Sequence, residues 1–269
     1  MSLIHAVVFD WAGTVVDFGC MAPVEALRTT FAAMGVDISD EEARRDMGMA
    51  KRDHIRSLLQ MDRVTSAWAA CQGGAPCEAD VDRLHDAVEP LMRAAAVQHS
   101  ALIPGAAEMV RGLRGQGIKI GSNTGYTRTM MSDILPAASA QGYQPDVVVC
   151  AGETPQGRPS PLMLWRVLSE LQVWPVRSCV KVDDAPVGVA EGVAAGTWAV
   201  GVAASGNGVG LSLDAYQQLA LVDRQTRVAR ASEALFAAGA DFVVETVADL
   251  PDVLSQIEGR LRAGEGPKG

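Results

Sequence analysis

Residues that could do chemistry stand at the ends of four short apolar runs: a carboxylate, a hydroxyl beside an amide, a cation, and a pair of carboxylates. In an open parallel sheet, ligands bind beyond the carboxyl ends of the strands, so groups at these places converge on one spot. Carboxylates suit a hard divalent cation, and an arginine suits an anionic oxygen. In chain order these residues are Asp10, then Ser122, Asn123 and Thr124, then Arg158, and finally Asp183 and Asp184.

Each of these residues also has an ordinary structural interpretation. An aspartate that ends a strand is often a turn or helix-capping residue. Ser122 and Thr124 could cap the following helix, Arg158 could be a solvated loop residue, and neighbouring aspartates such as Asp183 and Asp184 are common on surfaces. The functional hypothesis depends on the conjunction, because every one of these groups follows an apolar run.

The apolar runs predict an α/β fold with a doubly wound parallel sheet. They are short, apolar throughout and separated by amphipathic segments, which is typical of parallel strands buried on both faces. The runs cover residues 4–9, 118–121, 147–150, 180–182, 198–202 and 242–244.

The segment between the first two runs contains no strand signal and repeats apolar residues at helical spacing. Pro23 and Gly35 bracket one helix, and Ser39 begins a capping box that opens the next. Residues 72–76 break the pattern, and a last helix is expected to kink or end near Pro90. This segment is therefore predicted to be an all-helical insertion in the α/β core.

The predicted domain boundaries follow from that insertion. Residues 1–18 together with 100–262 form the α/β catalytic core, and residues 19–99 form the helical cap domain. Two crossings, near residues 17–20 and 99–104, would serve as hinges. The polar, glycine-containing tail, residues 263–269, is predicted to be disordered.

The composition excludes several classes of protein. Of the 269 residues, 48% are hydrophobic and 20% are charged, which excludes a disordered or fibrous chain. The net charge of −9 comes from acidic residues spread along the chain, so no basic surface exists for nucleic acid or anionic lipid. Any phosphate-bearing partner must therefore be small and bound locally.

The sequence carries no targeting signal that we can identify. The start, MSLIHAVVFD, lacks the basic region of a signal peptide, and no apolar run approaches the length of a membrane span. We expect a cytoplasmic protein whose five scattered cysteines are reduced thiols. Cys71 and Cys77 lack the spacing of a zinc site.

Four segments resemble the motifs of the haloacid dehalogenase-like superfamily of aspartate-nucleophile phosphotransferases. They are DWAGT with Asp10, GIKIGS with Ser122, GRPSP with Arg158, and KVDD with the acidic pair, and the resemblance spans residues 4–260. The helical insertion resembles the mobile cap of that superfamily. A closer resemblance, carried by DWAGTVVDFGC, MGMAKRDHI, GSNTGYTR and GRPSP, is to its phosphonatase family, the phosphonoacetaldehyde hydrolases.

The resemblance implies a role for each motif. Asp10 would be the nucleophile, and Mg²⁺ would be held by Asp10, Asp184 and the backbone carbonyl of Ala12. Arg158 would supply a positive charge where many relatives have a lysine. Asp183 stands where many relatives have glycine, so Asp184 is the expected metal ligand. Ser122 and nearby backbone N–H groups would cradle the phosphonate oxygens, with Asn123 or Thr124 contributing.

Ala12 departs from ordinary phosphatases, which have a second aspartate at this position to protonate the leaving group. Without that acid, hydrolysis of a phosphate ester should be slow, since general acid catalysis contributes about 10²–10⁴-fold. Cleavage of a carbon–phosphorus bond expels a carbanion, which leaves only if an adjacent carbonyl becomes an iminium. A lysine amine makes that iminium by forming a Schiff base.

Lys51, in MGMAKRDHI, is the lysine that the resemblance assigns to the Schiff base. Lys119 and Lys181 lie within strand-like runs and are expected to point to neither ligand loop, and Lys268 is in the tail. Arg52, the start of a helix and the apolar neighbours of Lys51 would lower the pKa of its amine. Without the resemblance, Lys51 would be interpreted as a solvated lysine.

Further residues of the insertion have open interpretations. His54, one turn after Lys51, could relay protons or could be a packed histidine. Met47, Cys20 and Tyr126 could line the substrate pocket or belong to the core. The resemblance also implies a homodimer formed through cap helices, and a role in the degradation of aminoethylphosphonate.

Two other functions remain open at this point. One is a phosphate-monoester hydrolase of the same fold, which Ala12 and Lys51 disfavour. The other is a phosphate sensor that has lost the reaction, which the presence of Asp10, Arg158 and Asp184 disfavours.

Overall fold

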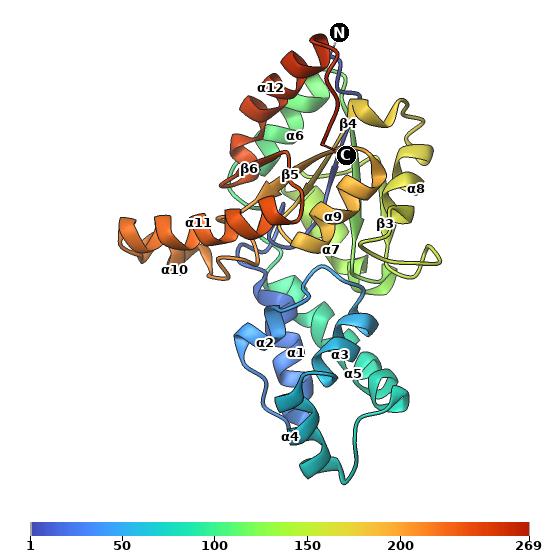
Figure 1. Ribbon diagram of the computed structural model, residues 1–269, viewed down its shortest axis with the longest axis vertical. Coiled ribbons are helices and arrows are strands. Elements are labelled where there is room, and N and C mark those ends of the chain that lie inside the picture. The colour runs from blue at the N-terminus through green and yellow to red at the C-terminus, as the bar shows by residue number, and fades with distance from the viewer. Residues whose placement is uncertain (1, 269) are drawn as a thin grey trace.

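A computed structural model describes residues 2–268 and contains one parallel sheet with helices on both faces (Figure 1). The predicted doubly wound α/β fold is confirmed, and all six apolar runs form strands. The order across the sheet is β3-β2-β1-β4-β5-β6. The strands are β1 Ala6–Phe9, β2 Lys119–Thr124, β3 Val147–Cys150, β4 Cys179–Asp183, β5 Trp198–Val202 and β6 Phe242–Val244.

The chain reverses its direction of winding between β1 and β4, so the crevice at the carboxyl ends of these two strands is a topological switch point. Phe9 of β1 is in register with Ser122 of β2 and with Val182 of β4. Asp10 is the next residue after this register position. The sheet therefore places Asp10 in the middle of its carboxyl-terminal edge.

Alternate residues of each strand face opposite layers of helices. On β1, Val7 and Phe9 join the apolar cluster that includes α6, α7 and α12, whereas Ala6 and Val8 join the cluster that includes α8. Helices α9 and α11 complete the second layer against β4, β5 and β6. The helices of the core are α6 Ala106–Gly115, α7 Arg128–Ala140, α8 Leu162–Glu170, α9 Pro186–Ala195, α10 Leu213–Gln218, α11 Leu221–Ala237 and α12 Leu250–Arg262, with 3₁₀ turns η1 Val176–Ser178 and η2 Val247–Asp249.

Five helices between β1 and α6 lie together at the carboxyl-terminal edge of the sheet, and we call them the helical lobe (Figure 1). The predicted capping box is present: the Glu42 amide donates to the Ser39 hydroxyl at 3.1 Å, and the Ser39 amide donates to the Glu42 carboxylate at 2.8 Å. The helices are α1 Met21–Ala33, α2 Asp40–Arg44, α3 Lys51–Leu59, α4 Asp62–Gln72 and α5 Glu78–Gln98.

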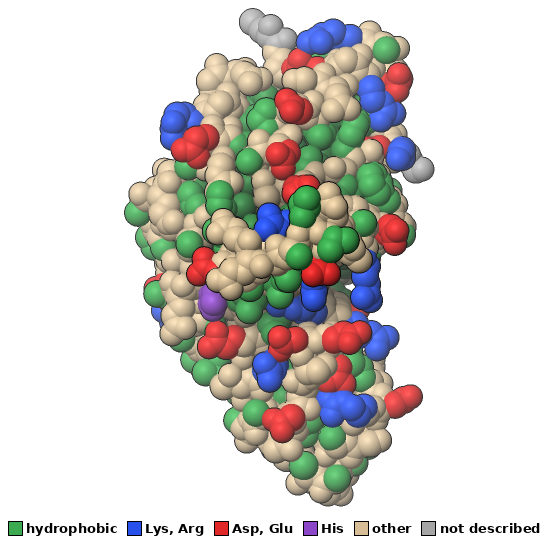
Figure 2. All heavy atoms as spheres, turned by 90° about the vertical axis from the view of Figure 1, so that its left-hand side faces the viewer, with side chains coloured by type: hydrophobic (Ala, Val, Ile, Leu, Met, Phe, Trp, Pro, Cys, Tyr) green, Lys and Arg blue, Asp and Glu red, His purple; other side chains and the backbone are tan. Residues whose placement is uncertain are grey.

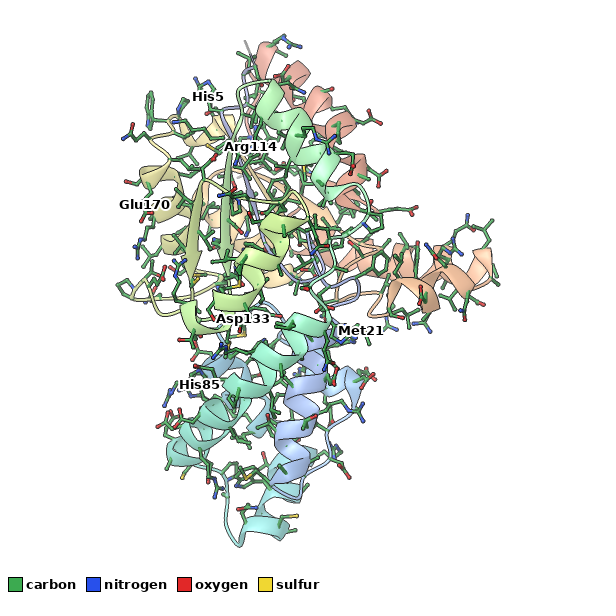
Figure 3. The ribbon with its side chains drawn as sticks, turned by 180° about the vertical axis from the view of Figure 1, so that it is seen from behind. His5, Met21, His85, Arg114, Asp133 and Glu170 are labelled. Atoms are coloured by element: carbon green, nitrogen blue, oxygen red, sulfur yellow. The ribbon has the colours of Figure 1, made fainter. Side chains whose placement is uncertain are left out.

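Helix α5 does not end near Pro90, although the sequence allowed that outcome. It continues to Gln98 because its buried face, with Leu84, Val88 and Met92, packs against α1. This apolar burial offsets the backbone hydrogen bond that the proline removes. On the outer side of α5, Arg93 pairs with Asp133 of α7 at 2.8 Å, which joins the lobe to the core (Figure 3).

The two connections between core and lobe lie side by side. Val16 and Leu102 form an antiparallel bridge, the Asp17 amide donates to the Ala101 carbonyl at 3.2 Å, and the Ile103 amide donates to the Val15 carbonyl at 2.9 Å. The predicted crossings are therefore neighbours in space.

Helices α10 and α11 extend away from the sheet as an arm (Figure 1). On the face from which the arm extends, acidic and basic side chains are interspersed (Figure 2). None of the helices within residues 2–268 is both long enough and apolar enough to cross a membrane.

The segment after α12, as far as Lys268, contacts other parts of the chain. The Lys268 backbone amide donates to the Asp241 carboxylate at 2.9 Å, and Glu265 pairs with Arg260 at 2.8 Å. These two contacts place the segment after α12 against the core. Gly269 lies outside the described residues.

Candidate active site

Three aspartates come together at the carboxyl-terminal edge of the sheet. Asp10 follows β1, Asp183 ends β4 and Asp184 comes next, and one oxygen from each lies within 4.8 Å of the others. All three are buried. Burial and mutual repulsion raise the pKa of Asp10 and of Asp184 above that of an ordinary aspartate. Such a cluster of carboxylates suits a divalent cation, whose charge would relieve the repulsion.

The three aspartates differ in where they face. Asp10, Ala12 and Asp184 line one small cavity, whereas Asp183 does not. Cys20 lies beside these oxygens, since its thiol donates to the Ala12 carbonyl and to the Asp184 carboxylate, both at 3.2 Å. The residues that the sequence predicted as metal ligands are thus adjacent.

Arg158 is the buried cation of the site. Its guanidinium donates to the Asp10 carboxylate at 2.7 Å, to Glu191 at 3.1 Å, and to both the backbone carbonyl and the side-chain oxygen of Asn123 at 2.7 and 2.8 Å. These bonds use the planar fork of the guanidinium fully. Arg158 therefore fixes the orientation of Asp10.

Lys181 also belongs to the site, and the expectation that it points to neither ligand loop is wrong. Its ammonium group lies 3.0 Å from Asp183 and 3.4 Å from Glu191, and it donates to the Asn123 side chain. The reason is strand alternation: Val180 and Val182 face one layer of helices, so Lys181 and Asp183 face the other. Helix α9 supplies the opposing carboxylate there.

Glu191 is the residue that the sequence analysis missed. It is fully buried in α9, in the otherwise apolar stretch PVGVAEGVAA, and its carboxylate accepts from Arg158 and from Asn123. The signal that could have found it is a single acidic residue in an apolar helix, because a buried carboxylate requires a buried partner.

The three polar residues at the end of β2 face different directions. The Ser122 hydroxyl donates to the Phe9 carbonyl at 2.8 Å, and the Asn123 side chain is held by Glu191 at 2.8 Å. Thr124 lines the cavity with Asp10 and Asp184. Neither hydroxyl caps the following helix, because Thr127 accepts from the Met130 amide instead.

Lys51 reaches the same cavity from the helical lobe. It is the first residue of α3 and is only 2% exposed, with its amine 3.7 Å from the Met47 sulfur and 3.4 Å from Nδ1 of His54. The pKa of Lys51 is lowered to about 8, chiefly by burial and also by Arg158, while Cys20 and Asp10 oppose the shift. At pH 7 about a tenth of the amine is therefore neutral, a far larger share than for an exposed lysine.

The predicted part of Arg52 in this shift is wrong. The Arg52 guanidinium lies on the outer side of α3, where it pairs with Glu78 at 2.8 Å and with Asp82 at 2.7 Å. Successive residues of a helix do not face one another, so Arg52 points away from the amine that precedes it. The lowered pKa comes from burial instead.

Two buried polar groups beside Lys51 have no hydrogen-bond partner among the described residues: Nε2 of His54 and the hydroxyl of Tyr126. Burial and the adjacent Lys51 lower the pKa of His54, so this histidine is neutral at physiological pH. The ring of Tyr126 lies 6.0 Å from the Lys51 amine. Tyr126 lines the cavity, where its hydroxyl can form a hydrogen bond with a ligand, whereas His54 lies behind Lys51 and does not line the cavity.

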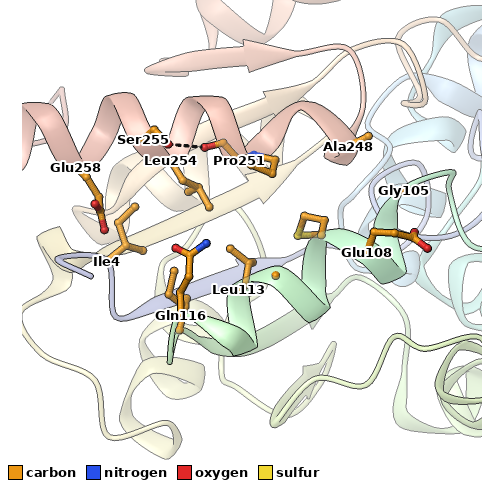
Figure 4. Close-up of a pocket in the computed structure, with 13 residues that line it drawn as sticks. Ile4, Gly105, Glu108, Leu113, Gln116, Ala248, Pro251, Leu254, Ser255 and Glu258 are labelled. Atoms are coloured by element: carbon orange, nitrogen blue, oxygen red, sulfur yellow. Dashed lines mark hydrogen bonds between the residues drawn. The ribbon is translucent and has the colours of Figure 1, made fainter. Parts of the chain in front are cut away.

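The cavity between lobe and core is very small. Its free volume is about 20 Å³, room for about one water molecule. A hollow of about 370 Å³ between α6 and α12 is larger but contains none of these residues (Figure 4). The cavity in this form is too small for any larger molecule.

Comparison with known proteins agrees with this geometry. The family model of the haloacid dehalogenase-like hydrolases matches residues 4–196. The phosphonoacetaldehyde hydrolase of Paraburkholderia phytofirmans is 49% identical over 99% of this chain and 100% of its own, and that of Syntrophobacter fumaroxidans is 42% identical over 98% and 95%.

A solved structure gives the same result for the fold. The crystal structure of a phosphonoacetaldehyde hydrolase like protein from Oleispira antarctica matches with a TM-score of 0.97 and 43% identity, covering 98% of this chain and 96% of that one. A hydrolase fold, a buried aspartate cluster and full-length relatives thus agree: the chain belongs to the haloacid dehalogenase-like hydrolases and, among them, to the phosphonoacetaldehyde hydrolase family.

Proposed function

We propose that this chain hydrolyses the carbon–phosphorus bond of phosphonoacetaldehyde and releases acetaldehyde and phosphate. The observation that carries the proposal is the shared cavity of Lys51 and Asp10, an amine of lowered pKa from the lobe and a carboxylate from the core. An amine can condense with an aldehyde while a carboxylate attacks phosphorus. The names of the full-length relatives support the choice of substrate.

The reaction begins with imine formation. The Lys51 amine adds to the aldehyde carbon, and loss of one water with uptake of one proton leaves an iminium. Asp10 then attacks phosphorus, the carbon–phosphorus bond breaks, and its electron pair moves into the iminium to give an enamine. Ala12 has no acidic side chain to protonate a leaving group, and this route needs none.

Two hydrolyses complete the cycle. Water attacks the aspartyl-phosphate, which releases phosphate and restores Asp10. The enamine is protonated on carbon, and water hydrolyses the resulting imine to acetaldehyde and free Lys51. Neutral His54, 3.4 Å from the Lys51 amine, moves protons to and from it during imine formation and hydrolysis.

The remaining residues bind and position the substrate. Thr124 and backbone N–H groups of its loop hold the phosphonate oxygens, and Arg158 holds Asp10 in line for attack. Ser122 bonds to the Phe9 carbonyl, directly before Asp10, and Asn123 accepts from Arg158 and so holds that side chain in place. Met47, Cys20 and Tyr126 close the cavity around the reacting groups.

Asp10, Asp184 and the Ala12 carbonyl would hold Mg²⁺. These oxygens fit it because Asp184 is buried, has a raised pKa and forms no ion pair within residues 2–268, and Asp10 lies beside it. When bound, the cation offsets the repulsion between the Asp10 carboxylate and the phosphonate dianion. Asp183 lies between Arg158 and Lys181, at 3.4 and 3.0 Å, and supports the cluster from behind.

The lobe is proposed to act as a mobile cap over the core. A cavity of about 20 Å³ cannot admit phosphonoacetaldehyde, so the lobe must open for the substrate and close to bring Lys51 to it. Membership in the family supports a homodimer formed through lobe helices, a cytoplasmic location, and a role in degrading aminoethylphosphonate.

The test is product analysis with purified protein. With phosphonoacetaldehyde and Mg²⁺, phosphate and acetaldehyde should appear in equal amounts, and a chelator should stop both. Turnover of p-nitrophenyl phosphate that matches turnover of the phosphonate would favour a phosphate-monoester hydrolase instead. Binding of the phosphonate without any product would indicate a sensor.

A further inference from the structure

The loop after β5 joins the lobe to the core at a place that the proposed chemistry does not use. Arg44, the last residue of α2, donates from its guanidinium to the Asn207 side chain at 3.1 Å and to the Gly210 carbonyl at 3.0 Å. The Asn207 side chain returns a bond to the Arg44 carbonyl at 3.0 Å. Arg44 also donates to the carbonyl of Gly19 at 2.7 Å. Gly19 belongs to residues 10–20, the linker between β1 and the first helix of the lobe.

The same loop contacts the proposed metal ligand. The backbone amide of Asn207 donates to the Asp184 carboxylate at 2.7 Å. Two residues earlier, the Ser205 hydroxyl donates to the Gly13 carbonyl at 2.7 Å. The backbone carbonyl of Ser205 accepts from the Gly19 amide, also at 2.7 Å. One short loop thus holds the carboxylate of Asp184, the segment after Asp10, and the linker to the lobe.

Two glycines allow this close contact. A Cβ at Gly206 would lie 2.7 Å from the Cβ of Asp184 and 2.6 Å from the Val202 carbonyl. Gly210 has a φ of +65°, and its Cβ would lie 2.7 Å from Nε of Arg44. Met21, whose sulfur lies 3.5 Å from the Arg44 guanidinium, is at this boundary of lobe and core (Figure 3).

From these contacts we infer that Arg44 and Asn207 form a clasp that couples closure of the lobe to the position of Asp184. The inference rests on the proposed metal site and on the proposed opening of the lobe. Opening separates Arg44 from Asn207 and Gly210, because the first residue belongs to the lobe and the others to the core. Closing restores the clasp and orders the amide that holds Asp184. Both are positioning residues, since neither lines the cavity.

The clasp is tested with Arg44→Met, Asn207→Ala and the double variant. Asn207→Ala removes the side-chain bonds to Arg44 but keeps the backbone N–H that reaches Asp184. Arg45→Met is the matched control, because Arg45 is exposed and its side chain makes no hydrogen bond or ion pair within residues 2–268. Calorimetric titration with Mg²⁺ alone measures metal binding without turnover, and hydrogen exchange measures the amides of residues 203–211.

Each single variant should bind Mg²⁺ about tenfold more weakly, as is typical when the group that orients a metal ligand is lost. The double variant should be no weaker than the worse single one, because both substitutions break one unit. Exchange of the 203–211 amides should rise about tenfold in all three. Arg45→Met should match the unaltered protein in both measurements.

Mg²⁺ affinity that stays within about twofold of the Arg45→Met control in folded Arg44→Met and Asn207→Ala would overturn the clasp. Independent, additive losses in the double variant would also overturn it. Thermal unfolding identifies any variant that has lost its fold, and Asn207→Ala, the smaller change, then decides. Failure of the proposed substrate would leave these metal and exchange measurements intact, so the two proposals fail separately.

Discussion

At the scale of single residues, the two buried lysines of the site have opposite surroundings. Lys181 is flanked by Asp183 and Glu191, at 3.0 and 3.4 Å, so its positive charge is compensated. Lys51 is surrounded by a thioether, a neutral imidazole and an aromatic ring. Nearby carboxylates keep a lysine amine protonated. Without them, a buried amine loses its proton more easily, and its nitrogen lone pair can act as a nucleophile. Only Lys51 is therefore suited to nucleophilic attack.

Replacement of Lys51 by arginine should abolish turnover. The guanidinium keeps the positive charge but forms no imine at neutral pH, so product release should fall by more than about 10³-fold. Borohydride reduction with substrate, followed by mass measurement, should find no adduct on the variant. Residual turnover above that level would contradict the role of Lys51.

Asp10→Asn is the counterpart that separates the two halves of the reaction. It removes the attacking carboxylate and leaves Lys51 in place, so the borohydride adduct should persist while phosphate release falls by more than about 10³-fold. Loss of the adduct as well would mean that Asp10 also orders the substrate or the lobe.

The rate of adduct formation should follow the protonation of Lys51. Its pKa is lowered to about 8, so the reactive neutral form increases through that pH. Below about pH 8 the trapping rate should fall about tenfold per pH unit, and above it the rate should level off. A rate that is flat between about pH 6 and 8, measured on folded protein, would show that the amine is not the titrating group.

At the scale of elements, helix α9 packs closely against strand β4 because glycines of the helix face the strand. A Cβ at Gly188 would lie 2.0 Å from the Asp183 carboxylate, which in turn holds Lys181 and Arg158. The helix can approach the strand, and bring Glu191 to its partners, only because this position has no side chain. The strand and the helix thus form one support for the aspartate cluster.

Gly188→Ala should therefore destabilise the protein and reduce its activity. Overpacking at this contact should lower the free energy of unfolding by about 1–3 kcal/mol, measured by denaturant titration. Gly259→Ala in α12 is the control, because a Cβ there meets nothing within 4 Å. It should raise stability by about 0.5–1 kcal/mol through helix propensity. Equal effects of the two substitutions would contradict the packing argument.

The strands and most helices were predictable because apolar periodicity reports burial, and burial on both faces is what β1 and β4 have. Lys181 and Glu191 were not, because a single charged residue in an apolar segment gives no direction until its partner on another element is known. The continuation of α5 through Pro90 was decided by packing against α1, which local propensity does not contain. The convergence of Asp10, Arg158 and Asp184 followed from topology alone.

At the scale of the whole molecule, the buried aspartates of the site link the stability of the fold to pH. Burial raises the pKa of Asp10 and of Asp184 above the ordinary value of 3.8, and that of Asp184 reaches about 8. A carboxyl whose pKa is higher in the folded than in the unfolded state stabilises the fold only while protonated. In metal-free protein, the contribution of these two carboxyls to stability should therefore be lost as pH rises from about 4 to 8.

Mg²⁺ should reverse that loss, because it offsets the charge that deprotonation leaves in the cluster. At about a hundred times its Kd, a ligand that binds only the folded state stabilises by about 2.7 kcal/mol, which corresponds to roughly 5 °C in Tm. The gain on adding Mg²⁺ in place of a chelator should be larger at pH 8 than at pH 5. Calorimetric unfolding checks this, and a gain that does not grow with pH would contradict the metal assignment to the aspartates.

The paired connections at Val16 and Leu102 limit the lobe's freedom of movement. Two chain segments bonded to each other act as one joint, so translation of the lobe would break their mutual hydrogen bonds while rotation about them would not. A lobe that rotates about one axis behaves as a lever: atoms near the joint travel little, and atoms far from it travel far. In the proposed opening, Cys20, one residue after Gly19, would remain near the aspartates, while Lys51, farther from the joint, would move along an arc. Under that proposal, the approach of the amine to the aldehyde and the formation of the clasp would belong to one rotation.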